Sequence, residues 1–410
     1  MSGTAILSSW KETSVRELVE KNILFPPMDG NHGEIHPKGN DFTSSGIPFI
    51  MASDISNSQI LFNSCKRISA AQAESLRKGF AITEDVLLTH KATLGRTAIV
   101  GNLSTPYIIL TPQVTYYRIK DCVHLSNKYL KYYFDSPFFQ GQLVNHGDSG
   151  STRSYIGITA QLDLPVILPP LQEQKAIAAV LSSLDDKIDL LHRQNATLEA
   201  MAEALFKQWF VVGAKEEGER TSLRNCLQLI TRGVTPRYAD SGIPVLNQKC
   251  IRAKEINSSF ARWHDISKPV TENKYLCIGD ILINSTGVGT LGRVAQVLHL
   301  DAETLVDSHI TIVRAKEGIS WNYLGFNLLS RQEEIEYLGE GSTGQTELAR
   351  ERLGELEVTV PPMKLIHDFD LFTIPMRQKS VANQRQIRTL EKLRDLLLPK
   401  LMNGEIRVAY

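Results

Sequence analysis

The sequence predicts an α/β (α+β) architecture with two similar domains and two long helices, and three observations lead to this prediction. The chain repeats itself once, each copy begins with short strand-like runs, and each copy ends in a helix-forming segment with heptad spacing. The repeat has priority among these observations, because an overlooked repeat misassigns the whole fold.

The repeat has a period of about 192–197 residues. Chance explains one matching pair of segments, but not six pairs that occur in the same order. The matching pairs are Gly46–Ile50 with Gly242–Leu246, Glu84–Thr89 with Gly279–Asn284, Leu94–Arg96 with Leu291–Arg293, Gly150–Thr152 with Gly341–Thr343, Pro169–Pro170 with Pro361–Pro362, and Arg193–Glu199 with Arg385–Glu391.

The first part of each copy predicts a globular domain of mixed α and β structure. Strand-like runs such as Val86–Thr89, Ala98–Val100 and Ile281–Ile283 are separated by Gly, Pro, Asn and Ser. One helix-like stretch follows in each copy, at about 126–144 and 320–338. We therefore expect the two domains at 1–170 and 221–362.

The second part of each copy predicts a long helix, at 171–212 and 363–404. Both segments are rich in Leu, Ala, Glu, Gln, Lys and Arg, which favour helices. Apolar residues of the first segment recur in alternating steps of four and three, the spacing of a coiled-coil seam. The seam residues are Ile177, Leu181, Leu184, Ile188, Leu191, Asn195, Leu198, Ala202, Leu205 and Trp209, and in the second segment Met376, Ile387, Leu390, Leu397 and Leu401.

Polar residues interrupt both seams. Asn195 lies within the first seam, where a buried amide specifies the register of paired helices at some cost in stability. The second seam has Thr373, Ser380, Asn383 and Arg394 at equivalent positions. Pro375 predicts a start or a kink of the second helix near this residue.

Burial of the two seams on each other predicts an intramolecular antiparallel coiled coil, with the domains as pseudo-twofold-related copies. The charged segment 213–220 predicts a linker, and 405–410 predicts a short tail. About 36 helical residues at ~1.5 Å each would separate the domains by about 54 Å, the length of roughly 16 base pairs of DNA. The alternative is a coiled coil that only staples two domains together.

The composition excludes several classes of protein. An apolar fraction of 42% with 45 basic and 45 acidic residues is typical of folded domains and not of disorder. No run approaches ~18 apolar residues and the first thirty residues are charged, so we expect a cytoplasmic protein without a membrane span. Five cysteines without paired spacing predict reduced thiols. Zero net charge argues against DNA binding by bulk electrostatics alone, although it leaves room for a local basic face.

Motifs for catalysis are missing or misleading. Gly287–Gly292 spells G-x-G-x-x-G, but the residues that follow predict a strand where a dinucleotide site needs a helix. The pair His32 and His36 lies beside Pro37, which disfavours the helix that would bring two metal ligands together. There is no P-loop and no Asn/Asp-Pro-Pro-aromatic motif. The sequence therefore predicts no catalytic centre, metal site or cofactor in this chain.

The segment Pro169–Ile177, with the heptads that follow through Trp209–Phe210, resembles the specificity subunits of type I restriction-modification systems. The segments Asp29–Gly33 and Arg232–Pro236, each ahead of a Gly-Ile-Pro, are similar to the openings of target recognition domains in that family. The second helical segment departs from the family, because its start lacks the Gln-Glu-Gln pattern.

The resemblance implies a non-catalytic subunit in which each target recognition domain reads one half of a bipartite DNA sequence. It also implies assembly with double-stranded DNA, two methyltransferase subunits and two motor-nuclease subunits. S-adenosylmethionine, ATP and Mg are then expected in those partner subunits. The alternative interpretation is a coiled-coil scaffold that binds protein partners. A third interpretation is a fused DNA-modifying enzyme, which the missing methyltransferase motifs disfavour.

Basic, amide and hydroxyl residues in loops are the candidates for DNA contact, because such groups bind phosphates and base edges. A solvated surface is the alternative for each. The candidates in the first copy are His32, His90, Lys91, Thr93, Arg96, Ser151, Thr152 and Arg153. Those in the second copy are Arg232, Thr235, Arg237, Lys249, Thr286, Arg293, Ser342, Thr343 and Gln345.

Overall fold

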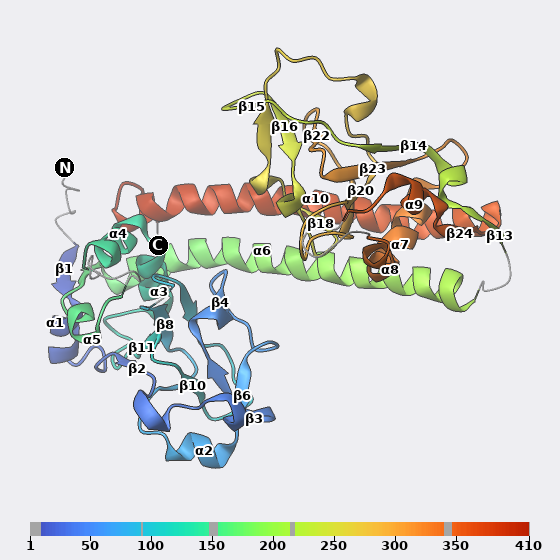
Figure 1. Cartoon of the computed structure of the whole chain (residues 1–410). Helices are drawn as coiled ribbons and strands as arrows, with labels where there is room; N and C mark the ends of the chain where they lie inside the picture. The colour runs from blue at the N-terminus through green and yellow to red at the C-terminus, as the bar shows by residue number, and fades with distance from the viewer. Residues whose placement is uncertain (1–9, 92, 147–154, 214–217, 340–346, 410) are drawn as a thin grey trace. The chain divides into compact units, whose positions relative to one another are not determined.

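The computed structural model describes residues 10–91, 93–146, 155–213, 218–339 and 347–409. Two compact units are formed: unit 1 from the described part of Met1–Asp189 with Arg388–Tyr410, and unit 2 from Leu190–Ile387. Two long helices, α6 (Leu171–Phe206) and α10 (Met363–Met402), each contribute residues to both units (Figure 1). None of the described helices has the length and apolarity needed to cross a membrane.

The described part of unit 1 contains two four-stranded sheets and two short ribbons. The main sheet is antiparallel, in the order β2 (Met28–Asp29), β11 (Val114–Tyr117), β8 (Val86–Thr89), β9 (Thr97–Ile99). The second sheet has the order β6 (Lys66–Ile68), β3 (Phe42–Ile50), β10 (Ile108–Leu110), β7 (Phe80–Ala81), with β3 and β10 parallel. The ribbons pair β1 (Lys11–Ser14) with β12 (Pro165–Leu168), and β4 (Ile55–Ser56) with β5 (Gln59–Ile60).

Unit 2 repeats the topology of the main sheet and most of that of the second sheet, in which the position of the outermost strand differs. Its main sheet has the order β14 (Leu227–Arg232), β23 (Ile310–Ala315), β20 (Ile281–Asn284), β21 (Val294–Gln296). Its second sheet has the order β15 (Tyr238–Ala239), β19 (Arg262–His264), β16 (Ile243–Leu246), β22 (Leu305–Val306), with β16 and β22 parallel. Its ribbons pair β13 (Glu219–Ser222) with β24 (Glu357–Val360), and β17 (Ile251–Arg252) with β18 (Glu255–Ile256). The repeat in the sequence is thus a repeat of the fold.

The two predicted helix-like stretches are each broken into two helices. The helices are α3 (Asn127–Asp135) and α4 (Pro137–His146) in unit 1, and α7 (Trp321–Ser330) and α8 (Gln332–Tyr337) in unit 2. The first break falls at Ser136, since a residue that precedes proline disfavours the helical conformation. The remaining short helices are α1 (Val15–Glu20), α2 (Ala70–Ser75), α5 (Ile158–Gln161) and α9 (Arg350–Glu355).

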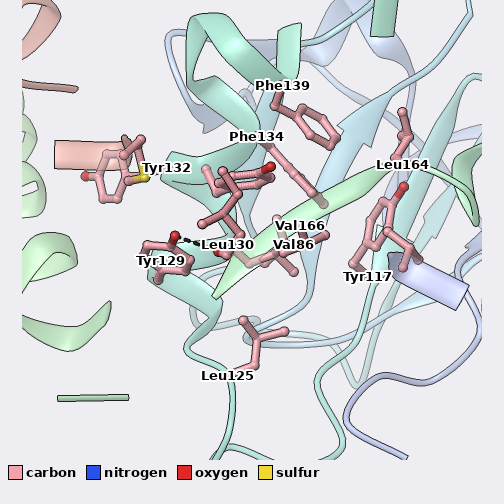
Figure 2. Close-up of a cluster of buried hydrophobic side chains, with 14 of the residues drawn as sticks. Val86, Tyr117, Leu125, Tyr129, Leu130, Tyr132, Phe134, Phe139, Leu164 and Val166 are labelled. Carbon is pink, nitrogen blue, oxygen red and sulfur yellow. Dashed lines mark hydrogen bonds between the residues drawn. The ribbon is translucent and has the colours of Figure 1, made fainter. Parts of the chain in front are cut away.

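The core of unit 1 lies between its main sheet, α3 and the long helices (Figures 1 and 2). Aromatic side chains of α3 and α4 fill this space, and Figure 2 shows Phe134 beside Phe139. The Tyr129 hydroxyl donates to the Ile167 carbonyl at 2.8 Å, and Tyr323 donates to the Thr359 carbonyl at 2.7 Å at the equivalent place in unit 2. A tyrosine at equivalent positions of the two copies therefore joins a helix, α3 or α7, to a ribbon strand, β12 or β24.

The long helices pair in antiparallel fashion. In unit 1 the start of α6, at Ile177 and Leu181, shares a core with the end of α10, at Leu401 and Met402. In unit 2 the end of α6, at Ala202 and Phe206, shares a core with the start of α10, at Ile366 and Phe369. The predicted seam residues that follow are all buried or half-buried, namely Ile177, Leu181, Leu184, Ile188, Leu191, Asn195, Leu198, Leu205, Ile387, Leu390, Leu397 and Leu401.

Two asparagines meet across the helix pair within unit 2. Asn383 Nδ2 donates to Asn195 Oδ1 at 2.8 Å, and Asn195 Nδ2 donates to Gln384 Oε1 at 3.2 Å. Because an amide facing an apolar residue would lose these bonds, this layer disfavours any slip of the helices past each other.

Helix α10 runs through Pro375 without interruption, so the expected start of a helix near this residue is wrong. Proline removes one helical hydrogen bond and widens the turn. Its ring lies on the exposed face of α10, where Leu371 and Phe372 are also exposed. Water can therefore solvate the carbonyl group that lacks a helical partner.

The Gln-Glu-Gln segment at the start of α6 closes unit 1. Glu173 is fully buried and accepts hydrogen bonds from Trp10 Nε1 at 3.1 Å and from Arg407 Nη2 at 2.9 Å. Gln174 accepts a hydrogen bond at 3.0 Å from the backbone amide of Ser126, the N-cap residue of α3. In unit 2 the equivalent start of α10 contributes the buried Ile366 to an aromatic cluster instead. The second copy lacks the polar pattern because its contacts there are apolar.

One ion pair is duplicated in the main sheet of each unit. Arg118 donates to both carboxylate oxygens of Asp85 at 2.8 and 2.7 Å, and Arg314 donates to both oxygens of Asp280 at 2.7 Å. Asp85 and Asp280 are almost completely buried. Each pair joins two neighbouring inner strands of the main sheet, because the arginine lies at the end of β11 or β23 and the aspartate directly precedes β8 or β20.

Replacement Asp280→Asn is expected to lower the free energy of unfolding of unit 2 by about 3 kcal/mol, since Arg314 keeps a largely buried charge without its counter-ion. Native-state hydrogen exchange at β20 and β23 measures the loss. The matched control is Glu357→Gln, because Glu357 pairs with Arg220 at 3.6 Å while both side chains are exposed. This control is expected to cost less than about 1 kcal/mol. Equal losses in the two variants would contradict the assigned role of the buried pair.

Candidate nucleic-acid interface

Several of the predicted DNA-contacting residues of each unit lie in one hairpin of the main sheet, namely His90, Lys91, Thr93 and Arg96 in unit 1 and Thr286 and Arg293 in unit 2. In unit 1 the hairpin joins β8 to β9 through Lys91–Arg96, and in unit 2 it joins β20 to β21 through Ser285–Arg293. The predicted strand after Gly287–Gly292 is confirmed, since β20 and β21 form an antiparallel pair on either side of this motif. All three of its glycines have positive φ, between 69° and 100°.

The repeated Leu-Gly-Arg sequence shapes both hairpins. Gly95 and Gly292 have φ of 88° and 81°, which favours glycine. Arg96 Nη1 donates to the Ile55 carbonyl at 2.9 Å, and Arg293 Nη1 donates to the Ile251 carbonyl at 3.4 Å. Each arginine thereby ties its hairpin to the neighbouring ribbon, β4–β5 or β17–β18. A structural role accounts for the recurrence of both residues.

A cluster of charged side chains lies near the hairpin of unit 1. His32 Nε2 lies 2.8 Å from Asp29 Oδ2, and Lys78 Nζ contacts Asp29 Oδ1. Burial raises the pKa of Asp29, but hydrogen bonds from Lys78 and His32 outweigh it, so this carboxyl group titrates below its usual range. Asn31 accepts hydrogen bonds from the Arg77 and Lys78 amides at 2.9 and 3.2 Å and so positions that loop.

His90, a predicted DNA contact, lies in the interior of unit 1, where the residue is only 1% exposed. Its Nδ1 lies 2.9 Å from the Ile156 carbonyl, and burial lowers the pKa of the ring despite that bond. A buried neutral imidazole joins the hairpin to residue 156 and does not reach a ligand surface. Its neighbour Lys91 is exposed, with Nζ 5.5 Å from the centroid of the Tyr155 ring.

In unit 2, Thr286 lies at the equivalent position of the hairpin. Its Oγ1 lies 2.8 Å from His309 Nδ1 and accepts a hydrogen bond from Gln248 Nε2 at 2.8 Å. Arg232 donates to Glu347 Oε1 at 2.7 Å and to the Leu348 carbonyl at 2.8 Å. Burial lowers the pKa of Arg232, whose side chain is 17% exposed. Arg232 therefore connects strand β14 to the segment after 347 more than it presents charge to solvent.

The other candidates fall into two groups. Thr235, Arg237 and Lys249 are exposed, and Thr93 is half-buried. The candidates Ser151, Thr152, Arg153, Ser342, Thr343 and Gln345 lie outside the described residues.

Several residues of these surfaces were not predicted. Lys78 belongs to the basic pair Arg77–Lys78 ahead of Gly79, which was a usable signal in the sequence. Tyr155 and His309 carried no such signal, because each reaches its hairpin only through the fold. The structure also contains a duplicated cation–π pair, with Lys66 over the Phe42 ring at 5.9 Å and Arg262 over the Tyr238 ring at 4.0 Å.

Comparison with known proteins identifies relatives of this chain. The family described as type I restriction modification DNA specificity domain matches residues 8–200. The MjaIX type I restriction enzyme specificity subunit of Methanocaldococcus jannaschii is 25% identical over 399 residues, which cover 90% of this chain and 88% of that protein. The HindI specificity subunit of Haemophilus influenzae is 22% identical over 495 residues, which cover 98% of this chain and 100% of that protein.

The fold has a counterpart among solved structures. The S subunit of a type I restriction-modification system from M. genitalium superposes with a TM-score of 0.64 at 14% identity, over 98% of this chain and 97% of that one. At this identity the likeness concerns the fold alone, and it includes both copies of the repeat. Residues 8–200 thus match the type I restriction modification DNA specificity domain, and over most of its length the chain is similar to two type I restriction enzyme specificity subunits.

Proposed function

We propose that the chain is the DNA-recognition subunit of a type I restriction-modification complex, in which each unit's sheet domain reads one half of a bipartite sequence. The observation that carries this proposal is the duplication of the hairpin with its arginine anchor, at Arg96 and Arg293. One chain then offers two similar but non-identical surfaces, as an asymmetric split sequence requires.

The exposed residues beside the hairpins suit contacts to DNA. Lys78, Lys91 and His32 in unit 1, and Arg237 and Lys249 in unit 2, can reach phosphates as partly or fully exposed groups. Base reading falls to the hairpin tips, and in unit 2 the exposed Gly287 and Gly289 permit a close approach of backbone to a groove. With a net charge of zero, the chain draws on its partner subunits for much of the phosphate neutralisation.

Helix length sets the gap between the half-sites in this proposal. Helix α6 has 36 residues and α10 has 40. At ~1.5 Å per residue, α6 is about 54 Å long, which corresponds to roughly 16 base pairs. The asparagine layer between α6 and α10 supports a fixed register for the pair.

Catalysis belongs to the partners in this proposal. Methyltransferase subunits, with two expected, bind S-adenosylmethionine and methylate the DNA, and two motor-nuclease subunits use ATP and Mg. We expect the complex to act in the cytoplasm. The support for these assignments is the family match of residues 8–200 and the similarity of the chain to a type I restriction enzyme specificity subunit.

Replacement Lys91→Met tests the surface of unit 1. In the assembled complex, this variant is expected to weaken binding to every DNA sequence similarly and to reduce the slope of log affinity against log salt by about one, because one phosphate contact is lost. Fluorescence anisotropy over a salt series measures both quantities. Lys21→Met is the control, since Lys21 is exposed at the C-cap of α1 and its side chain pairs only with Glu17 among the described contacts. An unchanged salt slope in Lys91→Met would remove Lys91 from the interface.

Insertion of one heptad into α6 and one into the facing part of α10 tests the spacing. Seven residues lengthen each helix by ~10.5 Å, so the gap between the half-sites is expected to grow by about three base pairs. Methylome sequencing of cells with the altered subunit and its partners reports both half-sites and the gap. A change in either half-site sequence at constant gap would contradict the proposed division of labour.

A further inference from the structure

The domain of unit 1 is held by one acidic turn of α6. Asp185 and Asp189 lie four residues apart and therefore on one face of the helix. Helix α3 reaches the first, since the Tyr132 hydroxyl donates to Asp185 Oδ2 at 2.7 Å. Ribbon β4–β5 reaches the second, since Gln59 donates to the Asp189 carboxylate. Two separate parts of the domain thus contact the same turn.

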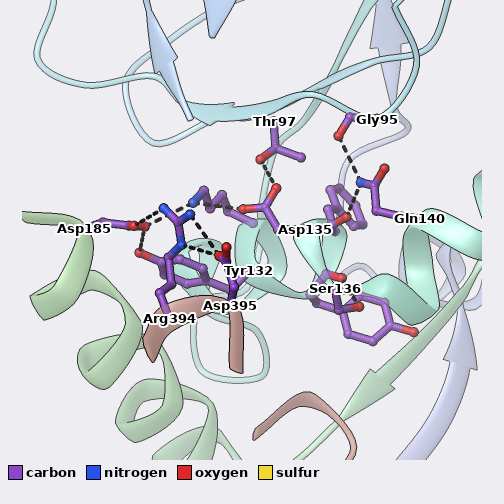
Figure 3. Close-up of polar contacts among 12 residues, drawn as sticks. Gly95, Thr97, Tyr132, Asp135, Ser136, Gln140, Asp185, Arg394 and Asp395 are labelled. Atoms are coloured by element: carbon purple, nitrogen blue, oxygen red, sulfur yellow. Dashed lines mark hydrogen bonds and ion pairs between the residues drawn. The ribbon is translucent and has the colours of Figure 1, made fainter. Parts of the chain in front are cut away.

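Asp185 also joins the second long helix. Arg394 Nη1 of α10 donates to Asp185 Oδ1 at 3.0 Å, and Lys131 Nζ lies 3.5 Å from Asp185 Oδ2 (Figure 3). The Lys131 side chain is 6% exposed, and its other ion pair is with Asp135 at 2.9 Å. A buried cation depends strongly on its counter-ions, because water cannot replace them. Domain, α6 and α10 therefore meet at one carboxylate.

Two routes connect this turn to the hairpin of unit 1. Thr97, which follows Arg96, donates to Asp135 Oδ1 at 2.5 Å, and Asp135 lies on α3 beside Lys131 (Figure 3). Gln140 of α4 donates to the Gly95 carbonyl at 2.9 Å. The second route runs from Arg96 to the Ile55 carbonyl in the ribbon whose Gln59 contacts Asp189. The hairpin is thus braced against α6 through both α3 and the ribbon.

We propose that Asp185 and Asp189 are positioning residues that set the orientation of hairpin 91–96 on the helices, and thereby the gap between half-sites that the complex accepts. This proposal rests on the proposed function. Hydrogen bonds to base edges are ~3 Å long and directional, so a recognition surface must be held to within about 0.5 Å. A domain that loses its bracing presents the same side chains, so its half-site stays the same while its selectivity for the gap falls.

Unit 2 fixes its domain with different chemistry. Arg377 of α10 lies over the Phe326 ring at 3.8 Å and also contacts Gln296. Lys254, in the turn of ribbon β17–β18, pairs with Glu203 of α6 at 2.6 Å. Of the two domains, the aspartate pair therefore contacts only the first among the described contacts. Substitutions of these aspartates leave the contacts of the second domain unchanged, so its half-site serves as an internal reference.

The test measures gap selectivity of the assembled complex with its methyltransferase partners. Equilibrium binding is compared among duplexes that contain both half-sites with the natural gap and with gaps one base pair shorter and longer. Asp185→Asn is expected to reduce the discrimination against wrong gaps about tenfold, which corresponds to ~1.4 kcal/mol. Asp189→Asn acts in the same direction. The matched control Asp186→Asn changes an exposed carboxylate between the two and is expected to keep discrimination within about twofold of wild type.

Tyr132→Phe is a second variant that tests the same bracing contact if Asp185→Asn does not fold. It removes only the hydroxyl that bonds Asp185 and keeps the ring beneath Lys131, whose Nζ lies 4.0 Å from the ring centroid. About threefold lower gap discrimination is expected, as for loss of one hydrogen bond. Unchanged discrimination, or equal weakening at every gap, would overturn the proposal. If the wild-type complex itself prefers no split sequence, the proposed function fails instead.

Discussion

The apolar contact between α6 and α10 is the interaction on which the rest of the structure depends. Neither domain completes its core alone, because Ile177 and Leu181 of α6 lie in the same cluster as Leu401 of α10 and the tyrosines of α3. In unit 2, Phe206 of α6 and Phe369 of α10 pack with Tyr323 and Phe326 of α7. Without the helix pair, each domain would expose a large aromatic surface, at a cost of ~25 cal/mol per Å². The helices are therefore part of both domains as well as a connection.

Buried polar groups give this contact its specificity. Apolar contacts tolerate small shifts of one helix along the other. A buried amide or carboxylate that loses its partner destabilises the fold, because its desolvation is no longer offset by a hydrogen bond or an ion pair. The Asn195–Asn383 pair and the Asp185–Arg394 pair both cross from α6 to α10. Glu173 adds a third such point, where it joins Trp10 and Arg407. Polar interruptions of the seam thus determine alignment, and apolar residues supply most of the stabilisation.

The hairpins that are proposed to contact DNA rest on rigid supports. Each hairpin is short, begins and ends in the main sheet and is anchored by an arginine to a ribbon. The duplicated Asp85–Arg118 and Asp280–Arg314 pairs secure the opposite ends of the same strands. This arrangement allows the exposed residues of the hairpins to differ between the copies while the supports stay the same. Two different half-sites can then be read by one fold.

The sequence by itself determined the duplication, the domain and helix order, and the coiled-coil spacing, because these follow from periodicity along the chain. Six matched segments and ten heptad positions were sufficient for that, and Asn195 was already recognised as a polar layer. Only the tertiary structure decided which polar residues face solvent. His90 and Arg232 read as surface ligands in the sequence, yet burial and carbonyl partners make them internal supports. Tyr132 and Asp185 are 53 residues apart in the chain and carried no local signal. Long-range contacts of this kind depend on how elements pack, and no pattern of neighbouring residues encodes them.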